Sequence, residues 1–339
     1  MASIQPALRA NTQSGFKSIQ GASLYGSPFF VQESPPDMPD RIKNLRQRAA
    51  IIQSIRDFFT SRGFLEVETP LRIPANAPEE HIDPFCSDDW YLQTSPEICM
   101  KRLLCRGHDN IFQISRCWRS NERGSRHIPE FTMLEWYRTN SDYNDLMKDC
   151  EDLLAWLSAG QNGDIKLLSS NSRFKSLCAK AERISVQEAF NRYSAVGMEA
   201  AVLGGSFDEI MVIDIEPALP KDVPVFLLDY PAEMAALARL KPNDLKVAER
   251  FELYLGGLEL ANGFSELNDP AEQRARFVEA NSKRVKAGHA SLPLPEVFLD
   301  ELAAMQPSAG IALGIDRLVM LLTGAEKIDD VIAFTPEEL

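Results

Sequence analysis

The chain has 339 residues, of which 45% are hydrophobic and 25% charged, and its formal net charge is −13. This composition is typical of a soluble globular protein with a sizeable core, and the negative balance provides no overall positive field for a large nucleic-acid footprint. No run approaches the length of a membrane span, and the N-terminus lacks the apolar segment of a signal peptide. We therefore expect a cytoplasmic protein that does not bind membranes.

The six cysteines form no CxxC pair and do not group with histidine at zinc-ligand spacing. They are interpreted as reduced thiols, and no structural metal is expected. The sequence also contains neither GxxxxGK[ST] nor GxGxxG, so a P-loop or a Rossmann nucleotide site is not indicated.

In chain order, residues 1–39 are rich in Ser, Gly, Pro and Gln, which is typical of an irregular arm rather than a domain. A helix is predicted from Asp40 to Gly63, and a strand over LEVETP closed by Pro70. Further strands are predicted at 90–94, 110–119, 129–138, 223–231 and 310–315, and helices at 142–159, 185–194, 271–288 and 316–324. This order indicates an α+β domain over residues 40–339, with a largely antiparallel sheet flanked by helices.

The segment ELYLGGLELANGFSEL, residues 252–267, carries three glutamates spaced seven residues apart. Its two central glycines predict a two-residue turn between strands rather than a helix interior. The register set by that turn would place Leu253 opposite Leu260, and Glu252 and Glu259 on one face of the sheet. Periodicity alone leaves open whether this face meets solvent or a polar cleft.

Four basic residues lie in a turn-rich stretch between two predicted strands: Arg119, Arg123, Arg126 and His127. Guanidinium groups there could clamp a phosphate, but composition alone favours a solvated hairpin tip. The next strand alternates so that one face holds Phe131, Met133, Glu135 and Tyr137. An acid beside an aromatic hydroxyl suits an ammonium ligand.

Two helix starts carry charged residues. Glu97 follows a Ser-Pro turn and is expected to be an acid in the first turn of a helix. Arg317 is expected in the first turn of another helix, where its charge opposes the helix dipole. We therefore expect Arg317 to have an anionic partner.

Several of these segments, in this order, resemble the class II aminoacyl-tRNA synthetases, most closely the lysyl subgroup. GFLEVETP, WRSNERGSRHIPEFTMLEWYR and GIALGIDRLVML resemble motifs 1, 2 and 3, and LELANGFSELND resembles the lysine-pocket signature. The resemblance covers residues 40 to the end and implies a single catalytic domain without an anticodon-binding domain, because the N-terminal arm is too short for one. TSPEICMKRLL and GIALGIDRLVMLLTGAEKIDDVIAF are similar in particular to the stand-alone paralogs that attach beta-lysine to elongation factor P.

The resemblance implies that ATP and Mg²⁺ are used to activate (R)-beta-lysine, or lysine, as an adenylate that is transferred to a lysine side chain of elongation factor P. It also implies a homodimer and no stable tRNA binding. The alternatives are a truncated lysyl-tRNA synthetase that charges tRNA, a non-catalytic paralog that binds lysine or ATP, and an ammonia-dependent amide ligase of the same fold. The last would need a pocket for a carboxylate side chain.

The resemblance also assigns residues to ligands. Arg119 and Arg317 would be catalytic and grip phosphates, and Glu252 and Glu259 would hold magnesium. Residues expected at ATP are Arg119, Asn121, Glu122, His127, Phe131, Glu259, Leu260, Gly314 and Arg317. Residues expected at the amino acid are Ser95, Pro96, Glu97, Glu135, Tyr137, Asn262, Phe264, Glu266 and Ala312.

Two positions refine these assignments. Motif 2 usually has glutamate two residues after its arginine, whereas Asn121 stands there in this chain and Glu122 follows. We take Glu122 as the preferred reader of the adenine amino group. Ala312 replaces the glycine of lysyl-tRNA synthetases and matches the elongation factor P ligases. Its methyl group would crowd an alpha-amine while a beta-amine could fit, a difference of about 1–3 kcal/mol.

Overall fold

The computed structural model describes residues 38–160 and 179–339, and these described residues lie in one compact unit. Residues 1–37 of the predicted N-terminal arm, and Cys178, lie outside the described residues. Within the two described ranges, no helix combines the length and the apolar character that a bilayer crossing requires. The five cysteines in these ranges are free thiols.

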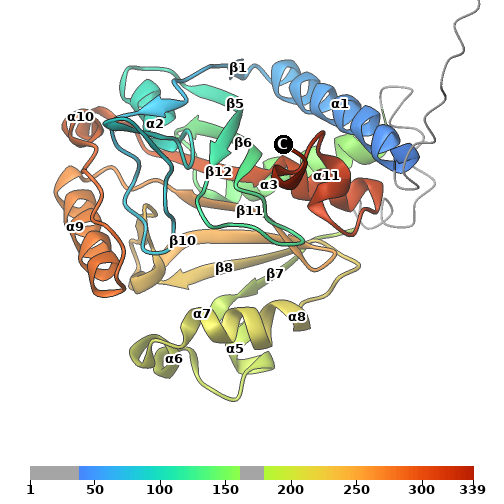
Figure 1. The fold of residues 1–339 in the computed structure, drawn as a ribbon. Coiled ribbons are helices and arrows are strands. Elements are labelled where there is room, and N and C mark those ends of the chain that lie inside the picture. The colour runs from blue at the N-terminus through green and yellow to red at the C-terminus, as the bar shows by residue number, and fades with distance from the viewer. Residues whose placement is uncertain (1–37, 161–178) are drawn as a thin grey trace, which may run out of the picture. The chain divides into compact units, whose positions relative to one another are not determined.

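A mixed sheet runs through the centre of the molecule (Figure 1). In the described residues it has nine strands, in the order β1 (Leu65–Glu66), β5 (Asn110–Trp118), β6 (Glu130–Thr139), β12 (Ser308–Gly314), β11 (Leu258–Ser265), β10 (Asp244–Leu255), β8 (Val225–Pro231) and β7 (Glu182–Ser185), with β9 (Leu240–Lys241) paired to β10. Only β1 with β5 and β7 with β8 are parallel among these neighbours. The predicted α+β fold with a largely antiparallel sheet is therefore confirmed.

Three helices cover one face of this sheet: α1 (Met38–Ser61), α3 (Tyr143–Ala159) and α11 (Ile315–Thr323). Helix α3 begins with a capping box, in which Asp142 and Asp145 each accept a backbone hydrogen bond, and it ends at Gly160 in the left-handed conformation. Phe59 of α1 lies at the centre of the core beneath them. Its ring centroid is 5.0–5.1 Å from those of Phe58, Phe64, Phe112 and Trp136.

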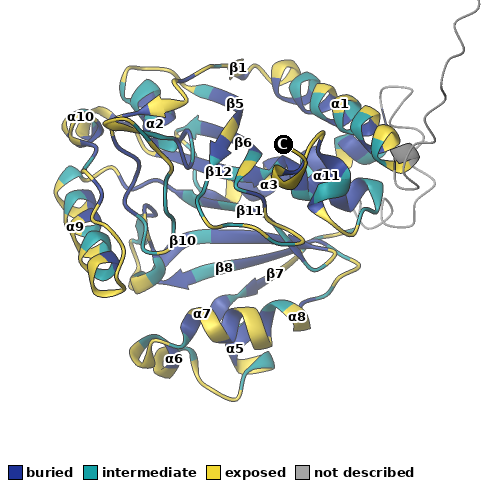
Figure 2. Cartoon of the chain, viewed as in Figure 1, coloured by how far each residue is buried: buried dark blue, intermediate teal, exposed yellow. Residues whose placement is uncertain are grey.

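The remaining elements surround the opposite face and the far edge of the sheet. Helix α2 (Glu97–Cys105) packs against β6 and contacts α10 (Glu296–Glu301), which in turn contacts α9 (Pro270–Lys286). Beyond β7 and β8 lie α5 (Val186–Tyr193), α6 (Met198–Gly204), α7 (Phe207–Ile210), a π-helical turn (Met211–Ile215) and α8 (Glu216–Ala218). A second small sheet consists of β2 (Arg72–Ile73), β4 (Trp90–Leu92) and β3 (Cys86–Ser87). In Figure 2 the central strands are mainly buried, and the exposed residues follow the outer sides of α1, α6 and α9.

The predicted hairpin is β10–β11, and its register differs from the prediction at one point. Leu255 pairs with Leu258 as expected, but Leu253 pairs with Ala261 rather than Leu260, because a bulge lies between Leu253 and Tyr254. The prediction for Leu253 was therefore wrong by one residue. The extra residue of the bulge shifts the pairing beyond it by one position, so Glu252 stands opposite Asn262, and both line the same cavity.

The turn of this hairpin requires glycine. Gly256 and Gly257 have φ values of 65° and 76°, as both central residues of a type I′ turn do. A Cβ atom on Gly256 would lie 2.6 Å from a methyl carbon of Leu321. The turn therefore packs tightly on α11, which holds Arg317.

Candidate active site

A cavity of about 630 Å³ lies on the face of the sheet opposite the α1–α3–α11 core. Alternation along β6 produces the two sides: Leu134 and Trp136 enter the core, and the predicted face of Phe131, Met133, Glu135 and Tyr137 lines the cavity. This predicted sharing of a face is confirmed. Of the residues assigned from the sequence, all but Pro96 and Glu266 line the cavity.

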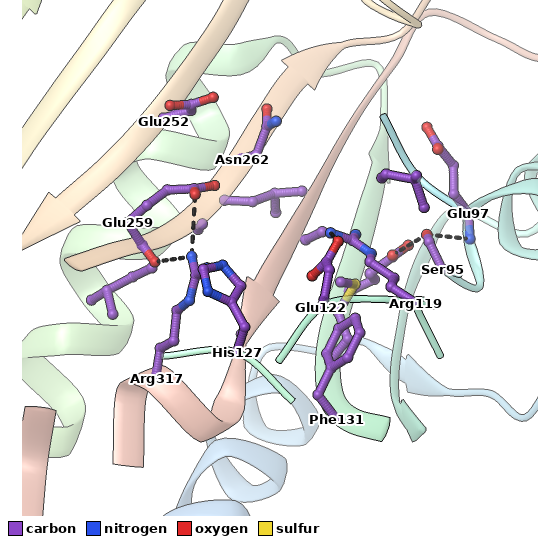
Figure 3. Close-up of a pocket in the computed structure, with 18 of the residues that line it drawn as sticks. Ser95, Glu97, Arg119, Glu122, His127, Phe131, Glu252, Glu259, Asn262 and Arg317 are labelled. Carbon is purple, nitrogen blue, oxygen red and sulfur yellow. Dashed lines mark hydrogen bonds and ion pairs between the residues drawn. The ribbon is translucent and has the colours of Figure 1, made fainter. Parts of the chain in front are cut away.

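One end of the cavity is built around Arg317, in the first turn of α11. Its guanidinium donates to the Glu259 carboxylate at 3.1 Å and to the Glu259 carbonyl at 2.9 Å, and its other nitrogen contacts His127 Nε2 at 2.6 Å (Figure 3). The predicted anionic partner of Arg317 is therefore Glu259. Burial and the positive charge of Arg317 lower the pKa of His127, so its imidazole is neutral at pH 7.

The basic loop between β5 and β6 forms part of the cavity wall, and Arg123, Arg126 and His127 are also exposed to solvent, as composition favoured. Arg119, Arg123, Arg126 and His127 all line the cavity. The Arg119 guanidinium lies 5.2 Å from the centroid of the Phe131 ring (Figure 3). Arg123 is already paired with Asp329 and Glu337, at 3.0 and 2.9 Å. Arg119 therefore has weaker protein contacts than Arg123 and is more available to an anionic ligand.

Glu252 and Glu259 line the cavity near Arg317. Sequence reasoning missed a third carboxylate, Glu216, which lies behind them and does not line the cavity. Glu252 accepts hydrogen bonds from Arg250 and from the Tyr254 hydroxyl, both at 2.7 Å. Glu216 of α8 lies 3.3 Å from the same hydroxyl. Lost solvation and the charge of Glu252 raise the pKa of both Glu259 and Glu216. A cation near these carboxylates would relieve their repulsion.

These residues fit magnesium better than a metal held by protein alone. Within the described ranges, no group of three or more His, Cys, Asp or Glu side chains has the geometry of a metal site. Magnesium is commonly bound by one or two carboxylates, with phosphate and water as its other ligands. Glu252 and Glu259 could hold it in this manner when phosphates are present.

The opposite end of the cavity is acidic and buried. Glu135, 1% exposed, accepts hydrogen bonds from the Ser95 hydroxyl at 2.5 Å and from the Tyr137 hydroxyl at 2.8 Å. Burial and the nearby charge of Glu97 raise the pKa of Glu135 to about 8. Burial also raises the pKa of Tyr137, so its hydroxyl stays protonated and donates. This end therefore holds carboxylates that lack sufficient positive charge around them.

Glu266 lies behind this end and pairs with a residue that sequence reasoning missed. Its carboxylate forms an ion pair with Lys101 of α2, whose Nζ is also 2.6 Å from Glu97 Oε1. The i, i+4 spacing of Glu97 and Lys101 on one helix was the available signal. A Cβ atom on Gly310 would lie 2.2 Å from the Tyr137 ring and 2.3 Å from Glu266 Oε1. Glycine at 310 thus lets both side chains pack against β12.

Comparison with known proteins agrees with this arrangement. Residues 37–338 match the family model of class II tRNA synthetases (D, K and N). The chain belongs to this family. It is 42% identical over 327 residues to the elongation factor P-(R)-beta-lysine ligase of Erwinia tasmaniensis, a match that covers 87% of this chain and 95% of the relative. Ligases with the same name from Salmonella dublin and Salmonella heidelberg are 40% identical over the same shares.

The class II assignment accounts for the order of the site along the chain. The motif 2 segment is the β5–β6 hairpin with its basic loop, and the motif 3 segment is β12 followed by α11. These strands are neighbours, since β12 pairs with β6 from Gly314 opposite Met133 to Ser308 opposite Thr139. The pairing brings the two arginine-bearing segments to one cavity although they are far apart in sequence.

Proposed function

We propose that this protein is an ATP-dependent ligase that activates (R)-beta-lysine, or lysine, as an adenylate and transfers it to a lysine side chain of elongation factor P. The observation that carries this proposal is that one cavity is lined both by arginines, which include Arg119 and Arg317, and by the carboxylates Glu97 and Glu135 beside Ser95. The first suits a nucleotide triphosphate, and the second suits an amino acid with a second ammonium group. The names of the most similar relatives supply the acceptor.

The arginine-rich end is proposed to bind ATP and magnesium. Arg119 and Arg317 would hold phosphates, and Phe131 would stack on the adenine. Glu252 and Glu259 would bind a magnesium ion, which would neutralise phosphate charge when present. Asn121, Glu122, His127, Leu260 and Gly314, which also line the cavity, would complete the nucleotide site. An anionic ligand would replace the Arg317–Glu259 contact, which lies partly in solvent.

The acidic end is proposed to bind the amino acid. Glu135, Tyr137 and Glu266 would receive the side-chain ammonium, and Glu97, beside Ser95 and Pro96, the backbone-side amine. A buried ammonium needs carboxylates and hydrogen bonds to offset its desolvation, several kcal/mol per ion. Asn262, Phe264 and Ala312 line the cavity between the two ends. A carboxylate side chain would be repelled here, which argues against an amide ligase that uses aspartate.

The chemistry has two steps. An oxygen of the substrate carboxylate attacks the alpha-phosphorus of ATP, the bond to pyrophosphate breaks, and an aminoacyl adenylate forms. The enzyme contributes positioning and charge stabilisation through Arg119 and Arg317. The neutral amine of the acceptor lysine then attacks the acyl carbon, an amide bond forms, and AMP leaves. The proton released by the acceptor amine passes to solvent.

We also propose a homodimer in the cytoplasm, where translation factors act. Apolar side chains are exposed on α1, on β1 and around the small sheet. They include Ile42, Leu65 and Trp90, which are 47%, 53% and 42% exposed. These exposed side chains are candidates for the contact between subunits. A dimer mass by light scattering at micromolar concentration is expected, and a monomer would contradict the proposal.

The function is tested by offering the purified enzyme two acceptors and two amino acids. Elongation factor P and total tRNA are each incubated with ATP and with beta-lysine or alpha-lysine, and products are read by intact mass and acid-precipitable label. A mass gain on elongation factor P with no label on tRNA is expected. Label on tRNA would instead support a lysyl-tRNA synthetase, and adenylate without transfer to either acceptor would remove the proposed acceptor.

A further inference from the structure

Lys101 is a fully buried lysine at the acidic end, and the proposed reaction does not use it. Its side chain is 1% exposed, and its ammonium lies between Glu97 and Glu266 and 5.0 Å from the centroid of the Phe264 ring. Burial lowers the pKa of Lys101, but the charges of Glu266 and Glu97 outweigh this and keep the pKa above its ordinary value. Lys101 is therefore a permanent positive charge beside the amino-acid pocket.

The charges around this ammonium come from several elements. Its titratable neighbours are Glu97 and Cys105 on α2, Glu266 after β11, and Glu135 and Tyr137 on β6. Glu301 of α10, which packs on α2, pairs instead with Arg102 and Arg106. The ammonium of Lys101 is thus the cation that pairs directly with Glu97 and Glu266, while Arg119 lies on the cavity side, near Thr94 and Glu122.

Counting these charges relates the pocket to its ligand. Glu97, Glu135 and Glu266 contribute three negative charges when ionised and Lys101 one positive charge, so these four residues have a net charge of −2. Glu79, a further buried carboxylate in the cavity wall, interacts mainly with Arg119. An amino acid with two ammonium groups would bring two positive charges. The two charges of the ligand and the net charge of these residues therefore balance. This balance matters because an uncompensated buried charge of either sign is costly.

We propose that Lys101 is a specificity-determining residue whose ammonium, fixed between Glu97 and Glu266, sets the pocket charge to match a diammonium amino acid. This inference rests on the proposed function and deepens it. Lys101 does not contact the reacting atoms. It acts through the neighbouring carboxylates, because its charge lowers the pKa of Glu135 and Glu266 while the charge of Glu97 raises it.

The test is a double-mutant cycle in which the charges of Glu97 and Lys101 are removed singly and together. ATP–pyrophosphate exchange stimulated by beta-lysine or lysine is measured from pH 6 to 9 in wild type, Lys101→Met, Glu97→Gln and the double variant. In Lys101→Met, kcat/KM for the amino acid should fall at least about tenfold at pH 7. The rising limb, the part of the pH profile in which kcat/KM increases with pH, should move up by about one pH unit. Glu97→Gln should move the limb to lower pH, and the double variant should return it toward wild type.

Two further measurements separate charge from folding. The effect of Lys101→Met should appear in KM for the amino acid, while KM for ATP changes by less than about twofold, and Lys101→Arg should keep the wild-type limb because it keeps the charge. Lys148→Met is the matched control, since it removes an exposed lysine that pairs with Asp152 on α3. Thermal unfolding is recorded for each variant. If Lys101→Met does not fold, the comparison of Glu97→Gln with the double variant measures the effect of removing the Lys101 charge.

The outcomes separate this inference from the proposed function. An active wild type with an unmoved limb in Lys101→Met, or in the double variant relative to Glu97→Gln, would overturn the inference and leave Lys101 a structural ion pair. A wild type whose exchange no diammonium amino acid stimulates would overturn the proposed function, and the inference with it. If the rising limb moves in opposite directions in Lys101→Met and Glu97→Gln and returns toward wild type in the double variant, both the inference and the proposed function are supported.

Discussion

The two ends of the cavity hold their charges in different ways. At the arginine-rich end, the side chains of Arg317 and Glu259 are 22% and 37% exposed, so water competes for their ion pair. At the acidic end, Glu135 and Lys101 are almost completely buried and held by fixed hydrogen bonds. A residue of an exposed ion pair can exchange its partner for a ligand at little cost, whereas a buried charged residue needs a ligand of opposite charge.

This difference indicates how the two substrates are selected. Phosphates can enter by replacing weak protein contacts, which favours any well-placed triphosphate. The amino acid has to supply the positive charge that the buried carboxylates lack. Selectivity for charge is therefore expected mainly at the buried end, and catalysis of adenylate formation mainly at the exposed end.

Replacing Glu259 tests the exposed end. In Glu259→Ala, amino-acid-dependent ATP–pyrophosphate exchange should fall at least about 100-fold with magnesium present, because the variant would lose the proposed magnesium ligand and the carboxylate that pairs with Arg317. Glu209→Ala, which changes an exposed glutamate on α7, should leave the rate unchanged. Near-normal exchange in Glu259→Ala would remove the metal assignment.

The buried end should instead respond to pH. Below about pH 8, Glu135 and Glu266 are partly protonated, because burial raises the pKa of each to about 8. Neutral acids attract an ammonium group weakly, so kcat/KM for the amino acid should rise from pH 6 to 8. The rise should end near pH 9–10, where the substrate amines lose their protons.

Glu135→Gln should lower kcat/KM for the amino acid about 10- to 100-fold and flatten part of this rise, since a charged hydrogen bond contributes about 1.5–3 kcal/mol. Glu130→Gln is the matched control, because Glu130 lies on the same strand with an exposed side chain beside Arg116. A pH profile of Glu135→Gln that matches wild type would show that Glu135 does not bind the ammonium.

Sequence reasoning located the alternating face of β6 and the helix start at Arg317, because both depend on local periodicity and capping. It missed the bulge beside Leu253, since bulges depend on how two strands fit together. It also missed Glu216 and the pairing of Lys101 with Glu266. These contacts join segments far apart in the chain, and a buried lysine has the same appearance in sequence as a surface lysine.

Ala312 tests the choice between isomers within the pocket. It lies on β12 opposite Asn262 on one side and Glu135 on the other, and all three line the cavity. Ala312→Gly should raise the use of alpha-lysine relative to beta-lysine by about tenfold, which is within the range for one methyl group. The measurement is the ratio of kcat/KM values in pyrophosphate exchange, and an unchanged ratio would refute the steric argument.

The smallest effect is expected at the adenine, where Glu122 and Asn121 are alternative readers of the amino group. Asn121 has φ 66°, a left-handed conformation that asparagine and glycine tolerate, so its identity has a structural reason. Asn121→Gly keeps that conformation and removes the side chain, which makes it the matched control for Glu122→Ala. If Glu122 reads the amino group, Glu122→Ala should reduce the preference for ATP over purine riboside triphosphate about 5- to 10-fold, and Asn121→Gly should not. The reverse pattern would assign the adenine contact to Asn121, at the position where glutamate is usual in motif 2.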